Sequence, residues 1–213
     1  MRSWLLAIAL SVTGAAAAAP PQRVEISYAV ERNGSVVAEV SERLEHDGRS
    51  YRLVESWKGR GLLALRGEAT RESRGTVAAD GLRPRTFEDR RTGRDSRKAE
   101  FDPAANVPTA RRQDRLSFIW SFAFFPPHKA VAVTVSDGKH VTEYVYEPAG
   151  REHLKTPAGE FDALRLVKRR KNSQERATEI WLAADRQFIP VRILVTEMDG
   201  TQLDQVAVKI AAQ

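Results

Sequence analysis

Hydrophobic and polar residues alternate in short runs along most of this chain. The first run covers residues 24–30, and similar runs follow at residues 36–44 and 51–57. Alternation of this kind is typical of a β-strand with one buried face, because successive side chains point to opposite sides. Asn33-Gly34 and His46-Asp47-Gly48 separate the runs as tight turns, so the chain is predicted to open with an antiparallel meander.

The same alternation recurs toward the end of the chain. Further runs that favour strands lie at residues 75–79, 85–91, 97–101, 131–135, 141–146, 164–166, 178–182, 191–195 and 206–210. About eleven strands separated by short turns are typical of a sandwich, a barrel or a strongly curved sheet. We therefore predict an all-β fold with one short apolar helix, in which a strongly curved antiparallel sheet of about eleven strands forms an open half-barrel.

Two apolar segments interrupt the alternation. One is short, at residues 61–65, and the other is DRLSFIWSFAFF at residues 114–125, which Pro126-Pro127 ends. Asp114 fits a helix N-cap, so the second segment is predicted to be a helix of about three turns. Leu116, Ile119, Trp120 and Ala123 would share one face, and Phe118, Phe122 and Phe125 another. A helix that is apolar on nearly all sides needs cover, and the concave face of the sheet would supply it.

The residues around position 158 favour a tight turn. Pro157 fixes its φ angle and Gly159 tolerates a left-handed backbone, so the chain is predicted to reverse there. Thr156 or Asp162 would bind the turn amides, and Phe161 would enter the core. This reading makes the segment a hairpin that builds the fold, and a ligand-binding loop is the alternative.

An ordered set of segments extends over most of the chain. They are Gly61-Leu62-Leu63-Ala64-Leu65, Val77 to Pro84 with Phe87, the apolar helix ended by Pro, Leu154 to Leu164, Ile180-Trp181-Leu182 with Asp185-Arg186, and Ile189 to Ile193. In this set the chain resembles the bacterial envelope family called domain of unknown function 3108, and the Thr-Pro-Ala-Gly-x-Phe-Asp phrase is its most specific part.

The resemblance implies an exported, mostly antiparallel β protein and, more remotely, the curved half-barrel of lipoprotein-carrier proteins. That family supplies no catalytic residues to carry over, and a shared fold does not dictate function. Two features depart from the family pattern. Prolines occur at residues 103–108, where a strand is expected, and the central helix is richer in Phe.

The first residues indicate export. Arg2 precedes the short apolar run of residues 4–10. Ala15 to Ala19 then offer several sites with the small-x-small pattern at which a signal peptide is cleaved. This pattern is typical of a secretory signal peptide, and the apolar run is too short to span a membrane. We expect residues 1–19 to be removed near Ala19, which leaves one β-rich domain at residues 20–213 in the periplasm. The chain has no Cys, so its core forms without disulfides.

The chain carries 34 Lys and Arg against 28 Asp and Glu, and loss of Arg2 lowers its formal net charge from +6 to +5. Basic residues gather in two blocks, at residues 90–98 and 165–171. At hairpin tips such blocks keep strand edges from pairing with other chains. They would also suit an anionic membrane surface or cell-wall polymer. Export and the lack of interleaved aromatic residues argue against nucleic acid as a partner.

Candidate catalytic chemistry is sparse. His46, His128, His140 and His153 are not spaced as metal ligands, so no metal or other cofactor is predicted. Glu152, Glu160 and Asp162 flank a turn, where carboxylates are usually solvated. Ser117 and Ser121 lack the surroundings of a hydrolase nucleophile. The protein is therefore predicted not to be an enzyme.

The apolar helix leaves two functional readings open. As a lid over a cavity, it would belong to a carrier of a lipid or another apolar or amphipathic envelope ligand. The predicted lining is then Trp57, Leu62, Leu63, Phe118, Trp120 and Phe122. As a permanent plug, it would belong to a structural or interaction protein with a solid core, which binds another protein or a cell-wall polymer.

Overall fold

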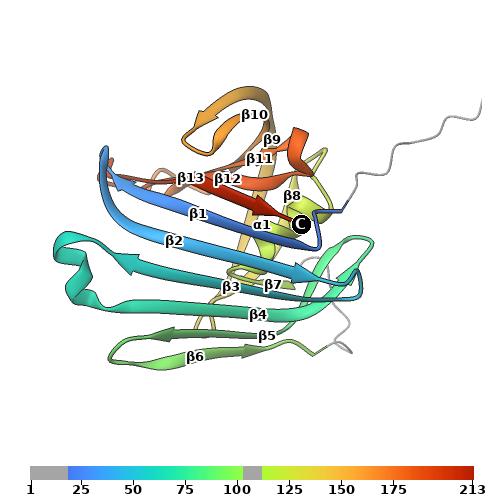
Figure 1. The fold of residues 1–213 in the computed structure, drawn as a ribbon, viewed down its shortest axis with the longest axis horizontal. Coiled ribbons are helices and arrows are strands. Elements are labelled where there is room, and N and C mark those ends of the chain that lie inside the picture. Colours follow the sequence, from blue (N-terminus) through green and yellow to red (C-terminus); the bar gives the residue numbers. More distant parts are fainter. Residues whose placement is uncertain (1–18, 103–111) are drawn as a thin grey trace, which may run out of the picture.

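The computed structural model describes residues 19–102 and 112–213, and these residues form one continuous thirteen-stranded sheet (Figure 1). The strands run in the order β6-β5-β4-β3-β2-β1-β13-β12-β11-β10-β9-β8-β7. Their bounds are β1 Arg23–Arg32, β2 Ser35–His46, β3 Ser50–Gly59, β4 Glu68–Ala78, β5 Gly81–Arg91, β6 Arg94–Glu100, β7 Arg112–Asp114, β8 Val131–Ser136, β9 Val141–Thr156, β10 Gly159–Lys168, β11 Ala177–Ala183, β12 Ile189–Thr196 and β13 Gln202–Ala212.

The sheet curls until its two ends approach each other. Neighbouring strands are antiparallel except for β7 and β8, which pair in parallel at one end. That end lies beside β5, where the Gln113 side-chain amide donates to the Leu82 carbonyl oxygen at 2.7 Å. The expected all-β, strongly curved sheet is confirmed as a nearly closed, barrel-shaped sheet, although the number of strands is thirteen rather than about eleven. The expected break at residues 103–108 lies outside the described residues.

Glycine turns fix the register of the hairpins. Asn33 and Gly34 both have positive φ, 48° and 82°, which is the backbone that a two-residue hairpin requires. Between β9 and β10, the Thr156 hydroxyl accepts a hydrogen bond from the Ala158 amide at 3.1 Å, and Gly159 has a φ of 137°. Phe161 follows in the core at 4 % exposure. The predicted hairpin is confirmed, with Thr156 as the residue that holds it.

The central helix is shorter than predicted. Helix α1 covers Ser117–Phe124, eight residues instead of about three turns from Asp114. Asp114 still belongs to β7, and its carboxylate accepts hydrogen bonds from the backbone amides of Leu116 and Ser117, both at 2.8 Å. It therefore holds the turn that leads into the helix instead of capping the helix itself.

Helix α1 lies inside the curved sheet and is buried between two groups of side chains. Leu116, Trp120 and Ala123 belong to one core cluster, and Phe118 and Phe122 belong to the other. The helix therefore has two packing surfaces, as predicted, but Ile119 packs against the second cluster and not with Trp120 as expected. Phe125 lies beyond the helix and is 56 % exposed. No helix in the described part of the chain is long and apolar enough to cross a membrane.

The turn between β4 and β5 fixes the position of α1. Gly81 has a φ of 117°, and a Cβ atom added there would overlap the Ser121 hydroxyl of the helix. The same hydroxyl accepts a hydrogen bond from the Leu82 amide at 3.1 Å. The missing side chain therefore allows strand and helix to approach closely.

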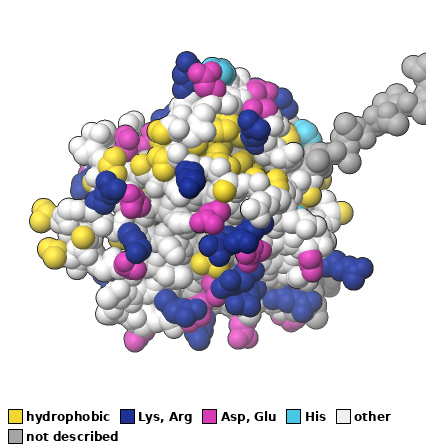
Figure 2. Space-filling view, in the orientation of Figure 1, with side chains coloured by type: hydrophobic (Ala, Val, Ile, Leu, Met, Phe, Trp, Pro, Cys, Tyr) yellow, Lys and Arg dark blue, Asp and Glu magenta, His cyan; other side chains and the backbone are white. Residues whose placement is uncertain are grey.

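The connection between β3 and β4 projects from one end of the sheet as the 3₁₀ helix η1, Gly61–Arg66. Leu62 and Leu65 lie there at 85 % and 86 % exposure. Figure 2 shows hydrophobic side chains at this protruding tip, on the left of the view. The apolar segment predicted from the sequence is thus a surface feature at the end of the molecule.

Candidate functional site: a charged hollow inside the sheet

A row of charged side chains crosses the concave face of the sheet. The strand register places Glu42 opposite Glu55, Glu55 opposite Arg71, and Arg71 opposite Asp89. All four residues are buried. Several of their neighbours on the same face are buried apolar residues, among them Leu44, Leu53 and Phe87, so this row is a polar band beside a hydrophobic interior.

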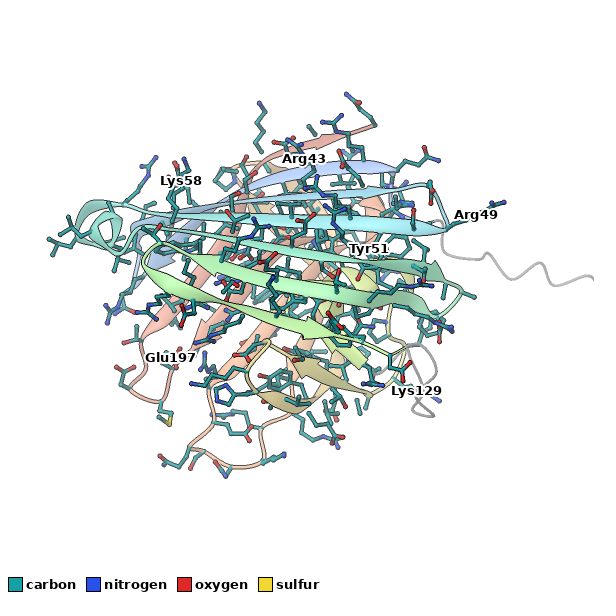
Figure 3. The ribbon with its side chains drawn as sticks, turned by 90° about the horizontal axis from the view of Figure 1, so that it is seen from below. Arg43, Arg49, Tyr51, Lys58, Lys129 and Glu197 are labelled. Atoms are coloured by element: carbon teal, nitrogen blue, oxygen red, sulfur yellow. The ribbon has the colours of Figure 1, made fainter. Side chains whose placement is uncertain are left out.

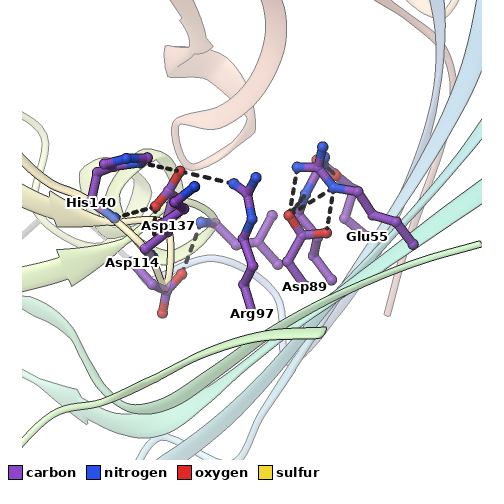
Figure 4. A network of polar contacts seen from close by, with 10 residues as sticks. Glu55, Asp89, Arg97, Asp114, Asp137 and His140 are labelled. Carbon is purple, nitrogen blue, oxygen red and sulfur yellow. Dashed lines mark hydrogen bonds and ion pairs between the residues drawn. The ribbon is translucent and has the colours of Figure 1, made fainter. Parts of the chain in front are cut away.

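Most charges of this row are satisfied by ion pairs (Figure 4). The Arg71 guanidinium donates to Glu55 and lies 3.4 Å from Asp89 through its Nε atom. Arg91 also binds Asp89, at 2.6 Å from Nη2 to Oδ2. Burial alone would raise the pKa of Asp89, but its hydrogen bonds with Arg91 and the charge of Arg71 hold that pKa below its usual range. Asp89 is therefore ionised near neutral pH.

Glu42 behaves differently. Burial, and next the charge of Glu55, raise the pKa of Glu42 to about 8, although a hydrogen bond from Trp120 acts in the opposite direction. Trp120 donates this bond from Nε1 to Glu42 Oε2 at 2.8 Å. Glu42 is thus mostly protonated and uncharged near neutral pH.

Two adjoining cavities lie against this row. The tip-side cavity, near the β3–β4 connection, has a volume of ≈ 420 Å³, and its apolar walls include Val30, Val40, Trp57 and Leu203. The helix-side cavity has a volume of ≈ 440 Å³ and is walled by side chains of α1 and by Tyr144. The residues that line both cavities are Glu55, Arg115, Arg176, Ile193, Val195 and Gln205. Volumes of this size fall within the range of about 300–1,000 Å³ that is usual for ligand pockets.

Arg115 stands between the two cavities. It follows Asp114 in the turn before α1, and its side chain is exposed to the hollow although protein surrounds it. Desolvation lowers the pKa of Arg115, and the neighbouring charge of Arg71 lowers it further. A guanidinium nevertheless stays protonated in proteins, so Arg115 presents a positive charge to both cavities.

A buried hydrogen-bonded chain holds the Arg115 turn in place. The Ser73 hydroxyl lies 2.8 Å from the Tyr51 hydroxyl and donates to Asp114 Oδ2 at 2.5 Å. Burial raises the pKa of Asp114 to about 6, although the bonds from Ser73 and from the amides of Ser117 and Leu116 lower it. These contacts fix the backbone on both sides of Arg115.

The structure separates the six residues predicted to line a cavity into four groups. Trp57 lines the tip-side cavity, and Phe118 and Trp120 line the helix-side cavity. Phe122 packs in the core, 5.7 Å from the Tyr146 ring between centroids. Leu62 is exposed and Leu63 is half-buried at the projecting tip, and neither lines the two cavities.

The charged residues of the hollow were not among these candidates. The period-two pattern carried a signal for two of them, because Glu55 shares its face with Tyr51 and Leu53, and Glu42 shares its face with Leu44. Arg115 gave no such signal, because it lies in a turn outside any alternating run.

A wider depression of ≈ 870 Å³ lies toward the opposite end of β2, β3 and β4. It is shallow, and exposed residues such as Arg23, Arg52 and Arg74 line much of it. Both Arg52 and Arg74 form ion pairs with Glu72, at 2.5 and 2.7 Å. Since several charges of this depression are already paired and its walls face solvent, we regard the inner hollow as the candidate site.

The two basic blocks are largely engaged within the protein. Arg97 pairs with Asp137 at 3.3 Å and Lys98 with Glu88 at 3.6 Å. In the second block, Arg169 pairs with Glu147. Within residues 19–102 and 112–213, no group of three or more His, Asp or Glu side chains could hold a metal ion.

Several solved structures are similar to this chain. A beta-barrel-like protein of domain of unknown function DUF1849 from Brucella abortus is 7% identical, with a TM-score of 0.46, and the match covers 91% of this chain and 99% of that one. A protein with a YmcC-like fold from Bacteroides fragilis is 13% identical, with a TM-score of 0.43 and coverage of 91% and 98%.

No curated protein matches this chain. Residues 23–206 match the family described as "Protein of unknown function (DUF3108)". This match extends from β1 into β13 and includes every residue of the inner hollow named above. The chain therefore belongs to the DUF3108 family.

Proposed function

We propose that this protein is an exported, non-catalytic binding protein of the bacterial cell envelope, which holds an apolar or amphipathic ligand in the inner hollow. One observation carries the proposal: the concave face of the sheet is not filled by α1, and two adjoining cavities of ≈ 420 and ≈ 440 Å³ remain beside the helix. A solid-core protein has no need of such a space, because protein interiors are normally close-packed.

The composition of the walls supports an amphipathic ligand. Apolar side chains such as Trp57, Ile193 and Val195 offer surface whose burial contributes about 25 cal/mol per Å². The charged row and Arg115 offer a polar floor beside them. Helix α1 is buried along both its faces, which favours a fixed wall over a lid that swings open.

Native mass spectrometry tests the proposal directly. Protein extracted from the envelope under mild conditions is expected to carry a lipid or another apolar small molecule, which appears as a bound mass that organic solvent removes. The stripped protein should then rebind extracted envelope lipid in titration. A protein that is free of ligand and ignores lipid would contradict the proposal, and would favour a structural protein that binds a protein or cell-wall polymer.

A pair of aromatic variants locates the binding. Trp57→Ala removes a half-buried wall of the tip-side cavity and is expected to weaken lipid binding about tenfold or more, because large aromatic contacts dominate binding energy. Phe125→Ala is the control, because Phe125 is 56 % exposed and lines neither cavity. Equal weakening in both variants would argue against the hollow as the site. Trp120→Ala is less informative, because Trp120 is 1 % exposed and its loss would also destabilise the fold.

A further inference from the structure

Most charges around the hollow balance one another, and Arg115 and the exposed Arg94 are the described charged residues lining the tip-side cavity that lack an ion pair. Arg115 differs from Arg94 because it lines both cavities. Glu55 is paired with Arg71, and Asp89 with Arg91. Of the other residues that line the tip-side cavity, Glu197 pairs with Arg176 at 3.5 Å and Glu68 pairs with Lys58 at 3.0 Å. Each of these carboxylates already has a basic partner.

The remaining carboxyl groups do not neutralise Arg115. Asp137, which lines the helix-side cavity, pairs with Arg97. Glu42 lies close to the row, but it carries a proton near neutral pH and accepts a hydrogen bond from Trp120. Among the described residues, the Arg115 guanidinium therefore has neither an ion pair nor a hydrogen bond.

An unpaired guanidinium inside a hollow is a strong site for an anion. Its planar group of donors matches the oxygens of a carboxylate or phosphate, which it can bind through two parallel hydrogen bonds. Such bonds are stronger where water is scarce, and the lowered pKa of Arg115 reflects such desolvation. A neutral or cationic head group would leave this charge unbalanced.

The surroundings of Arg115 also define where an apolar chain would lie. Ile193 and Val195 line both cavities next to it. From there, Trp57 and Leu203 continue the apolar wall toward the tip end. We propose that the hollow binds a long-chain amphiphile with an anionic head group, whose carboxylate or phosphate oxygens bind Arg115 while its chain lies along this wall.

This inference rests on the proposed function and names its ligand class. Its test compares palmitate, hexadecyl phosphate and the neutral alcohol hexadecanol, which share one chain length and differ in the head group. Affinities are measured near neutral pH by displacement of a neutral fluorophore such as N-phenylnaphthylamine. Wild-type protein is expected to bind the two anions at least about tenfold more tightly than the alcohol, equivalent to about 1.4 kcal/mol. The tighter of the two anions then identifies carboxylate or phosphate as the preferred head group.

The variants assign the preference to one side chain. Arg115→Gln is expected to weaken binding of both anions about tenfold and to change binding of hexadecanol by less than about twofold. The control is Arg49→Gln, which removes the same charge from an exposed turn at the end of the sheet away from Lys58 (Figure 3). It should bind all three ligands like wild type. Because Arg115 forms no ion pair, its replacement should leave the melting temperature nearly unchanged.

Three outcomes would overturn the inference, and they can be told apart. If wild type binds hexadecanol as tightly as the anions, the hollow binds chains without regard to charge, and the proposed function stands while the head-group assignment falls. If Arg115→Gln weakens alcohol and anions equally, Arg115 has a structural role only. If no ligand of the three binds, the proposed function itself fails.

Discussion

Glu42 places a carboxyl group inside the sheet beside a second one, Glu55, directly opposite on the next strand. Two negative charges on buried residues that lie opposite each other would repel, and a proton on Glu42 relieves this repulsion. The Trp120 side chain then has an uncharged acceptor for its N–H group. One residue thus links the sheet, the central helix and the charge balance of the hollow.

The proton on Glu42 makes stability depend on pH. In the folded protein the Glu42 carboxyl keeps its proton up to about pH 8. In the unfolded chain the same carboxyl is exposed and has a pKa of 4.5, so it loses its proton at a lower pH. Between these values the folded state binds more protons, so the free energy of unfolding falls as pH rises from about 4.5 to about 8. Glu42→Gln keeps an acceptor for Trp120 and removes the titration. This variant is expected to be more stable than wild type above about pH 8, by on the order of 1 kcal/mol or more.

Urea unfolding at pH values on either side of this interval would measure the effect. Glu143→Gln, at an exposed position of β9, serves as the control and should follow the wild-type curve. Parallel curves for Glu42→Gln and wild type across the whole interval would show that Glu42 does not titrate as described.

Some of the site could be predicted at the level of single residues, and some could not. The alternating pattern placed Trp57 on an inward face, and the helical period placed Phe118 and Trp120 inside; the structure finds all three at the hollow. Leu62 has an equally apolar side chain but is exposed, because a local run of leucines does not reveal whether a turn folds inward or projects. The partner of each charge depends on strand register, which single positions do not encode.

At the scale of elements, the position of α1 depends on the β4–β5 turn. Its Asp-Gly sequence predicts a turn, but the helix that packs on Gly81 comes from a segment 39 residues later, as the Leu82–Ser121 hydrogen bond shows. The three-residue strand β7 was also missed, because it is too short for any alternation to be visible. Both features depend on long-range packing that local sequence patterns do not report.

Gly81→Ala tests this packing. The added methyl group would overlap the Ser121 hydroxyl, and the positive φ disfavours any side chain. We expect the free energy of unfolding to fall by about 1–3 kcal/mol, with faster hydrogen exchange in α1. The control is Gly150→Ala, which has a φ of 107° but no atom within 4 Å of the added carbon. A loss no greater than in this control would mean that backbone strain alone, and not the approach of the helix, determines the cost.

At the scale of the whole molecule, the sheet is a ribbon whose two ends meet without pairing as a continuous ladder. Arg97 of β6 reaches Asp137, beyond β8, and the Gly138 backbone lies against β6. The close-up in Figure 4 shows this contact beside the charged row. The overall curvature followed from the number of predicted strands, whereas the near closure depends on these side-chain contacts between distant segments.

Arg97→Gln should loosen this junction without unfolding the sheet. Both side chains are partly exposed, so the expected change in the free energy of unfolding is below about 1 kcal/mol. Hydrogen exchange is nevertheless expected to become faster in β6 and in the β8–β9 turn, while β1 and β13 keep their protection. Arg151→Gln is the control, because its pair with Asp162, at 3.0 Å, joins neighbouring strands. Unchanged exchange at β6 would show that the ends are held by other contacts.

The pairing of β1 with β13 has a consequence for the order in which the sheet folds. Val24 lies opposite Ala212, so the middle of the ribbon joins the first described strand to the last. Strands β1 to β6 and strands β8 to β13 are each a succession of neighbouring hairpins that can form locally, whereas this central ladder must wait for β13. Contacts of such high sequence separation slow folding. Until β13 pairs with it, β1 keeps an unpaired edge, and the ribbon is completed by the last of the described strands.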